Sequence, residues 1–168
     1  MGGGVHFTPE QLMTHLRELG IETRTIFHAP VFTVDEARRV RGRLSGGHCK
    51  SLFLRDKKRH LWLLVALEHR KLDFKQLRYP LEASSRLSFG SPELLLETLG
   101  VTPGSVTPFA LINDREHRVT VALDRAMLEV SPLHYHPLIN DRTSAIAPED
   151  LLRFLESTGH RPLLLELS

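Results

Sequence analysis

The sequence predicts a single α+β domain, residues 1–168, in which a mixed β-sheet is flanked by helices. Helix-start signals and strand-like apolar runs are interspersed along the chain, without the regular βαβ alternation of a parallel sheet. A chain of 168 residues, 41% hydrophobic and 25% charged, has ordinary globular composition and can bury about two-thirds of its unfolded surface. These observations favour one globular domain built on a mixed sheet.

Helices are predicted where a capping residue precedes apolar residues at helical spacing. Thr8 is followed three residues later by Gln11, a capping-box pattern that begins a helix. Ser91 and Pro92 form a second capped start, and that helix ends at Gly100. The predicted helices cover residues 8–19, 34–41, 72–77, 92–99 and 148–157.

Strands are predicted from apolar or alternating runs bounded by turn residues. The run 48–55 turns through 56–59 and returns as 60–67, which predicts a hairpin of two central strands. The other predicted strands and extended pieces cover residues 22–28, 86–89, 109–112, 119–123, 128–133 and 163–167.

Charge, cysteine content and hydropathy exclude several classes of protein. The formal net charge of +2 is too small for a protein coated in nucleic acid, so any contact with phosphates would be a local patch. The single cysteine, Cys49, excludes an internal disulfide and a zinc site built from clustered cysteines. The apolar run 61–67 is too short to cross a bilayer, and residues 1–6 lack signal-peptide features. We therefore expect a cytoplasmic protein without membrane association.

The segment from Gly100 to Asp114 combines more backbone constraint than any other part of the chain. Its prolines fix φ, Gly104 can adopt positive φ, and its hydroxyl side chains can bond their own main chain. These residues predict a stiff, exposed loop whose N–H and C=O groups can converge on an ester, a small amine and hydroxyls. A proline-stiffened turn between a helix and a strand is the alternative.

Lys50 is unusual because it lies at the start of a strongly apolar strand. A lysine in that position is expected either to extend its ammonium group to the surface or to meet an anion. The neighbouring Cys49 should face the other side of the strand, where its thiol serves as small core filling rather than as a nucleophile.

The most concentrated positive charge lies on the predicted helix 34–41, which Thr33 and Glu36 open as a capping box. The patch consists of Arg38, Arg39, Arg41 and, just beyond the helix, Arg43. It is either a solvated helix face or a surface that binds the acidic backbone of a nucleic acid.

Four parts of the chain, taken together, resemble the YbaK and prolyl-tRNA editing-domain family. They are Thr33–Ala37, the strand that carries Lys50, the segment Gly104–Asp114, and His136–Asn140 with Thr143. The similarity runs over nearly the whole chain. Within the family, the match is closest to the free-standing deacylases that clear alanine from mischarged proline tRNA. One Gly-x-x-x-Pro motif means little, but this order of elements is specific.

The resemblance implies a YbaK-like, barrel-like mixed sheet flanked by helices, and an aminoacyl-tRNA hydrolase that releases alanine from Ala-tRNA(Pro). It assigns catalytic roles to Lys50, Gly104 and His136, with Lys50 at a phosphate or the terminal ribose and His136 lining the pocket. The loop that would cradle the alanyl group consists of Gly104, Ser105, Val106, Thr107 and Pro108. Asn140 and Thr143 also match family positions. They can either act in the site or have a structural role, fixing the last loop.

The partners implied by the resemblance are the acceptor end of tRNA and, transiently, prolyl-tRNA synthetase; no cofactor or metal is implied. Help from a neighbouring hydroxyl of the tRNA is also implied, and no Gly-x-Ser-x-Gly elbow or Ser/His/Asp set is evident. A synthetase pocket shaped for proline cannot strongly reject alanine, because missing methylenes are worth only about 1–3 kcal/mol. A second, hydrolytic pocket that is too small for proline excludes correctly charged prolyl-tRNA by steric clash and leaves it intact.

Other functions remain open on the sequence alone. The released amino acid can be cysteine or serine instead of alanine, because pocket volume is a three-dimensional quantity. His134 and His136 would share one face of a strand and suit a metal hydrolase, although no His-Glu-x-x-His spacing supports this. A non-catalytic nucleic-acid-binding module would use the arginine patch and the turn at residues 55–59.

Overall fold

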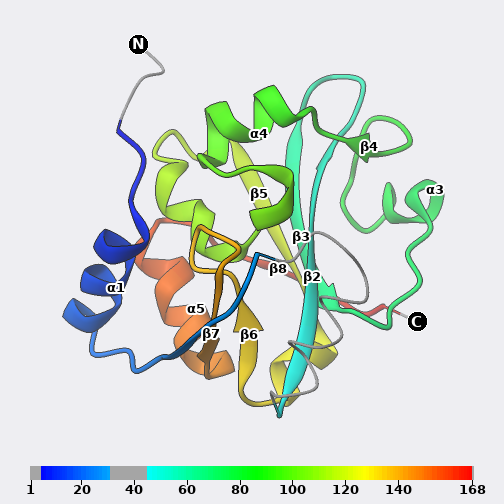
Figure 1. Ribbon diagram of the computed structural model, residues 1–168. Helices are drawn as coiled ribbons and strands as arrows, with labels where there is room; N and C mark the ends of the chain where they lie inside the picture. The colour runs from blue at the N-terminus through cyan, green and yellow to red at the C-terminus, as the bar shows by residue number, and fades with distance from the viewer. Residues whose placement is uncertain (1–4, 31–44, 168) are drawn as a thin grey trace.

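The computed structural model describes residues 5–30 and 45–167 and shows a mixed eight-stranded sheet with helices on both sides (Figure 1). The strand order is β1-β7-β6-β2-β3-β5-β8, and β4 pairs with β2. The predicted α+β architecture is therefore confirmed. The predicted helix 34–41 and the arginine patch lie outside the described residues.

The strands are β1 (Arg24–Phe27), β2 (Gly47–Arg55), β3 (Leu61–Leu67), β4 (Ser88–Phe89), β5 (Val119–Asp124), β6 (Leu133–Tyr135), β7 (Arg142–Ile146) and β8 (Leu163–Leu165). The α-helices are α1 (Pro9–Glu18), α3 (Phe74–Leu77), α4 (Pro92–Leu99) and α5 (Pro148–Ser157). Three short 3₁₀ helices are η1 (Pro103–Ser105), η2 (Pro108–Asn113) and η3 (Arg125–Glu129).

The hairpin of β2 and β3 forms the centre of the sheet, as predicted. Its antiparallel register runs from Cys49 opposite Leu67 to Arg55 opposite Leu61. On its outer side, β3 pairs in parallel with β5, and β2 pairs in parallel with the start of β6. Because both strands have neighbours on each side, their backbone groups are largely satisfied within the sheet.

Apolar side chains on the two faces of β3 enter two separate cores, which explains why this strand reads as a continuous hydrophobic run. Leu63 and Val65 belong to the larger core, together with residues of α1, α4, α5 and η2. Trp62 and Leu64 belong to the smaller core, which the segment containing α3 and β4 covers. Figure 1 shows α3 and β4 on one side of the hairpin and α1 and α5 on the other.

The predicted helix caps at Thr8 and Ser91 are confirmed, and the one predicted at Thr33 lies outside the described residues. In α1 the Thr8 hydroxyl accepts from the Gln11 N–H at 3.1 Å, and the Gln11 side chain accepts from the Thr8 N–H at 2.9 Å. At α4 the Ser91 hydroxyl accepts from the Leu94 N–H at 3.1 Å, and Gly100 ends the helix with φ 69°. A left-handed residue at this position favours glycine.

Two predicted strands are wrong. Residues 109–112 belong to the 3₁₀ helix η2, whose N-terminus is formed by Pro108 and capped by the Thr107 hydroxyl, which accepts from the Phe109 N–H at 3.3 Å. A short run that is apolar throughout does not distinguish a buried strand from a buried helical turn. Residues 128–133 contain the end of η3, and β6 begins only at Leu133.

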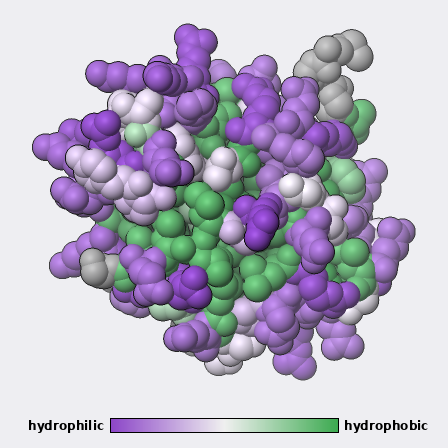
Figure 2. All heavy atoms as spheres, turned by 180° about the vertical axis from the view of Figure 1, so that it is seen from behind, coloured by the Kyte–Doolittle hydropathy of each residue, from purple (hydrophilic) through white to green (hydrophobic). Residues whose placement is uncertain are grey.

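The helices and one face of the molecule bear on how the protein meets its surroundings. Across residues 5–30 and 45–167, the helices are too short or too polar to cross a bilayer. Figure 2 shows, on the face opposite to that of Figure 1, an area of hydrophobic side chains surrounded by hydrophilic ones.

Candidate functional site

The loop from Gly100 to Pro108 joins α4 to η2, and it is exposed only in its first half. Gly104 and the two residues before it are exposed, whereas Ser105 and Thr107 are 4% and 0% exposed. Val106 is half-buried and packs against the larger core. The expectation of an exposed loop is therefore wrong for its second half, because η2 buries its own N-terminus and uses the Thr107 hydroxyl as its cap.

Gly104 lies against the loop between β6 and β7. A Cβ atom added at Gly104 would lie 3.2 Å from the Asn140 side-chain nitrogen, which is closer than an ordinary van der Waals contact. The absence of a side chain at Gly104 thus lets the Asn140 amide approach the main chain of the loop. The structure brings these two residues together although 36 positions separate them in the sequence.

A pair of histidines lies at the ends of β1 and β6. The Nδ1 atom of His136 is 3.0 Å from the Arg142 carbonyl oxygen, so Nδ1 carries the proton and donates. Nε2 is then the nitrogen with the lone pair. The ring of His28 is centred 6.2 Å from that of His136, and its Nε2 atom is 2.8 Å from the Thr143 hydroxyl.

Burial lowers the pKa of His136 from its ordinary value, and the nearby His28 acts in the same direction. The hydrogen bond to the Arg142 carbonyl acts against this shift but is outweighed. His136 is therefore neutral at pH 7 and presents Nε2 as a hydrogen-bond acceptor or proton acceptor.

Lys50 lies on β2, two residues beyond His48 and on the same side of the strand. The strands β2 and β6 are parallel, with Gly47 opposite Leu133 and His48 opposite His134. The printed register of β2 with β6 ends there, and the Lys50 ammonium group reaches the segment after β3, the other neighbour of β2, where it meets Arg70.

The Lys50 ammonium group is half-buried and donates to the Arg70 carbonyl oxygen. We expected a solvent-exposed ammonium group or an anionic partner, and the partner is instead a backbone carbonyl. That carbonyl is held in place because the Arg70 guanidinium donates to the buried Asp124 carboxylate, with Nε at 3.0 Å. The hydrogen bond to Arg70 uses one of the three Lys50 donors.

Cys49 faces the opposite side of β2 and packs against the larger core, as predicted. Burial raises the pKa of its thiol to about 11, although the Tyr135 side chain lowers it slightly. The thiol therefore stays protonated at pH 7 and is core filling rather than a nucleophile.

The structure brings the predicted residues together in two groups, Gly104 with Asn140, and His136 with Thr143 through His28. Lys50 instead bonds the Arg70 carbonyl oxygen. His28 was not predicted, and no local pattern distinguishes a histidine at the end of an edge strand from a solvated one. Within the described parts of the chain, no group of three or more histidine, cysteine or acidic side chains is placed to hold a metal ion.

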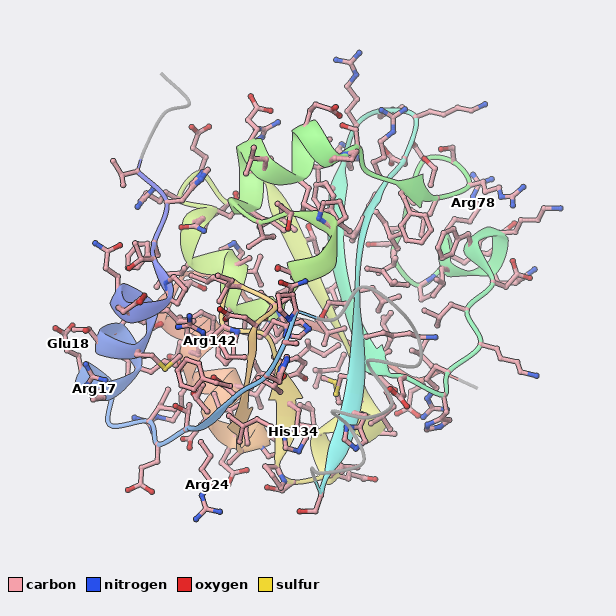
Figure 3. All side chains as sticks on the ribbon, in the orientation of Figure 1. Arg17, Glu18, Arg24, Arg78, His134 and Arg142 are labelled. Atoms are coloured by element: carbon pink, nitrogen blue, oxygen red, sulfur yellow. The ribbon has the colours of Figure 1, made fainter. Side chains whose placement is uncertain are left out.

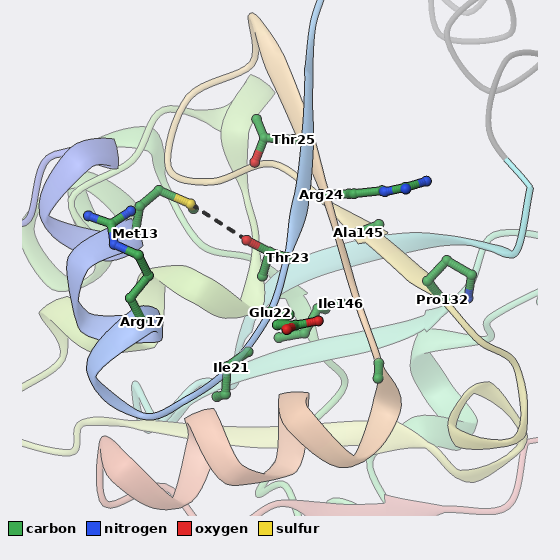
Figure 4. A pocket seen from close by; sticks show the side chains of 11 residues that line it. Met13, Arg17, Ile21, Glu22, Thr23, Arg24, Thr25, Pro132, Ala145 and Ile146 are labelled. Carbon is green, nitrogen blue, oxygen red and sulfur yellow. Dashed lines mark hydrogen bonds between the residues drawn. The ribbon is translucent and has the colours of Figure 1, made fainter.

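A groove of about 720 Å³ lies on a different part of the molecule, between α1, β1 and β7 (Figure 4). Arg17 and Arg24 line it, and the Thr23 hydroxyl donates to the Met13 sulfur at 3.8 Å. None of the residues predicted to act in the site lines this groove.

Comparison with known proteins gives consistent results. The model of the family described as aminoacyl-tRNA editing domain matches residues 28–154. The chain is 43% identical to a Danio rerio protein named prolyl-tRNA synthetase associated domain-containing protein 1, over 97% of this chain and 91% of the relative. It is 33% identical to the prolyl-tRNA editing protein ProX of Acetoanaerobium sticklandii, over 94% and 96% of the two chains.

Solved structures share the fold. One described as a candidate trans-editing enzyme for prolyl tRNA synthetase superposes with a TM-score of 0.71 at 19% identity, over 98% of this chain and 99% of the other. At that identity the comparison supports the architecture and not a shared substrate.

Proposed function

Because the chain belongs to the aminoacyl-tRNA editing-domain family, we propose that it is a trans-editing deacylase. The reaction is hydrolysis of mischarged Ala-tRNA(Pro) to free alanine and tRNA(Pro). A cytoplasmic location and a transient association with prolyl-tRNA synthetase belong to the same proposal. The name of the Danio rerio relative and that of ProX are the support for the proline system.

The observation that carries the proposal is the meeting of the Gly104 loop with the loop that follows β6. A Cβ atom on Gly104 would crowd the Asn140 amide at 3.2 Å, and His136 lies at the start of the second loop. Main-chain groups and one amide that converge in this way suit a small aminoacyl group, whose ammonium and carbonyl need fixed polar partners. The larger pyrrolidine ring of proline would be disfavoured by its volume.

The chemistry requires little beyond positioning. An aminoacyl ester is already activated, so the protein must hold it against a nucleophilic oxygen and stabilise the oxyanion that develops. Lys50 supplies a cation for a phosphate or the terminal ribose. Neutral His136 supplies Nε2, which can accept a hydrogen bond from the attacking water or from a ribose hydroxyl.

A multiple-turnover deacylation panel with alanyl-, prolyl-, cysteinyl- and seryl-tRNA tests the proposal. We expect alanine to be released fastest and prolyl-tRNA to persist. Faster release of cysteine or serine would mean that cysteinyl- or seryl-tRNA, and not alanyl-tRNA, is the preferred substrate. Salt-sensitive tRNA binding with all four esters intact would instead indicate a non-catalytic binding module. A rate that collapses after exhaustive chelation would indicate a metal hydrolase.

Deacylation is expected to depend on pH through His136. Protonation removes the Nε2 acceptor, and the pKa of His136 is lowered from 6.5. The enzymatic rate, corrected for spontaneous hydrolysis, should therefore be flat near pH 7 and fall only at a pH below 6.5. Single-turnover rates between about pH 5 and 8 measure this profile.

The variant His136→Ala should deacylate alanyl-tRNA more slowly than the wild type, and its rate should no longer fall as the pH is lowered. The variant His69→Ala, which removes an exposed histidine, should keep the pH dependence of the wild type. An unchanged inflection in His136→Ala would assign the titration to another group.

A further inference from the structure

The segment between β3 and α4 exposes large aromatic side chains. Phe89 on β4 is 62% exposed and Tyr79, just after α3, is 67% exposed. Phe74 is half-buried and meets Phe89 edge to face, with ring centroids 5.2 Å apart and planes at 69°. The Arg78 guanidinium lies 5.6 Å from the centroid of the Tyr79 ring. Phe74 and Phe89 are called the aromatic pair below.

The exposed aromatic side chains are not what attaches this segment to the rest of the fold. The segment is anchored to the smaller core by aliphatic side chains, namely Leu77, Leu81, Ala83 and Leu87. Phe74 covers that core, whereas most of the Phe89 ring faces water. Exposed, contiguous aromatic surface on a folded protein commonly marks a binding site.

The charge around the aromatic pair indicates what binds there. Apart from Arg70, which is paired with Asp124, residues 69–89 carry four lysines and arginines against two acidic residues, whereas the whole chain has a net charge of only +2. Lys71 and Lys75 are exposed on either side of Phe74 in the sequence. Aromatic faces combined with cations are what proteins use to bind unpaired nucleotides, whose bases stack while their phosphates are neutralised. A purely apolar protein partner would not require these cations.

The position of the aromatic pair relative to Lys50 follows from the register of the sheet. Phe89 is opposite Leu54 in the antiparallel pairing of β4 with β2, so both side chains lie on the same face. Side chains alternate along β2, which puts Lys50 on that face as well. Four residues of strand separate Lys50 from Leu54, about 13 Å.

The surroundings of the aromatic pair are visible in the figures. Figure 1 shows β4 alongside β2 with α3 beyond it, and in Figure 3 Arg78 lies across β2 from His134 and Arg142. The elements α3 and β4 thus lie on the other side of β2 from β6 (Figure 1).

We propose that the aromatic pair is a stacking platform for the unpaired cytidines that precede the terminal adenosine of tRNA. This inference rests on the proposed function, because it assumes that the aminoacyl ester lies at Lys50 and His136. With the ester there, the preceding nucleotides run along β2 and reach Phe89. Their bases stack on the rings, and Lys71 and Lys75 neutralise their phosphates. The platform holds the 3′ end and takes no part in ester cleavage.

Kinetics of Phe89→Ala test the platform. We expect KM for alanyl-tRNA to rise roughly 5- to 100-fold, equivalent to about 1–3 kcal/mol for one stacked base, with kcat unchanged. The alanyl ester of adenosine lacks the cytidines, so its hydrolysis should be unaffected. Phe89→Trp should restore a KM near that of the wild type, and Leu96→Ala, which truncates an exposed leucine on α4, is the matched control. An unchanged KM, or an equal loss with the adenosine ester, would overturn the proposal.

A binding measurement separates this inference from the proposed function. Uncharged tRNA with a fluorescent cytidine analogue next to the terminal adenosine should change its fluorescence on binding to the wild type, because stacking alters the emission of the base. Phe89→Ala should lose that change, while Leu96→Ala should keep it. An identical change in wild type and Phe89→Ala refutes the platform. Absence of deacylation with an intact fluorescence difference refutes the proposed function alone.

Discussion

Replacing Lys50 by alanine should reduce deacylation of alanyl-tRNA by at least about 100-fold, the effect of removing one well-placed donor to a developing charge. The reason is geometric as well as electrostatic. Lys50 lies on β2, the strand that pairs with β6, and the Arg70 carbonyl fixes its ammonium group. Two further donors of that ammonium group remain for an anionic oxygen of the substrate.

Single-turnover rates at pH 7 measure the effect of Lys50→Ala, with thermal unfolding as the check on the fold. Lys58→Ala is the matched control, because Lys58 carries the same charge on the exposed turn of the same hairpin. Lys50→Arg should recover little, since the planar guanidinium is larger and directs its donors differently. A Lys50→Ala rate equal to that of Lys58→Ala would remove Lys50 from the mechanism.

Replacing Asp124 by alanine should lower the free energy of unfolding by about 3–5 kcal/mol, as expected when one partner of a buried ion pair is removed. Asp124 is fully buried, and its carboxylate accepts from Arg70 Nε at 3.0 Å and from the Leu67 N–H at 3.2 Å. Its loss leaves the Arg70 guanidinium, itself only 18% exposed, without this counter-ion, and the Leu67 N–H without an acceptor.

Urea unfolding at pH 7 measures this loss of stability. Glu97→Ala is the control, because it removes an exposed pair in which Arg118 lies 3.7 Å away and should cost less than about 1 kcal/mol. Asp124→Asn should be intermediate, since an amide oxygen can still accept from the Leu67 N–H. A similar stability for Asp124→Ala and Glu97→Ala would contradict the expectation.

The variant Asp124→Ala should also reduce deacylation activity. Arg70 supplies the carbonyl that orients Lys50, so a displaced Arg70 should slow deacylation under conditions in which the variant is still folded. The ion pair between Asp124 and Arg70 thus positions Lys50 without contacting the substrate.

Local patterns were sufficient to predict much of the architecture from the sequence. The capping box at Thr8, the cap at Ser91 and the hairpin of residues 48–67 were predicted correctly, because local capping residues and a short turn between two apolar runs indicate them. The side of β2 on which Cys49 lies followed from strand alternation alone. The apolar run after Pro108 was misassigned, because a short buried run suits a strand and a 3₁₀ turn equally well.

The arrangement of the candidate site was decided by the tertiary structure. His28 and His136 are 108 positions apart and become neighbours because β7 pairs with both β1 and β6, and Gly104 meets Asn140 across 36 positions. The burial of Ser105 and Thr107 depends on how η2 packs against the larger core. The sequence by itself determined the helix starts and most of the strand segments, since capping residues and hydrophobic periodicity are local signals. Packing of distant apolar faces determined the strand register, and the register decides which polar side chains meet.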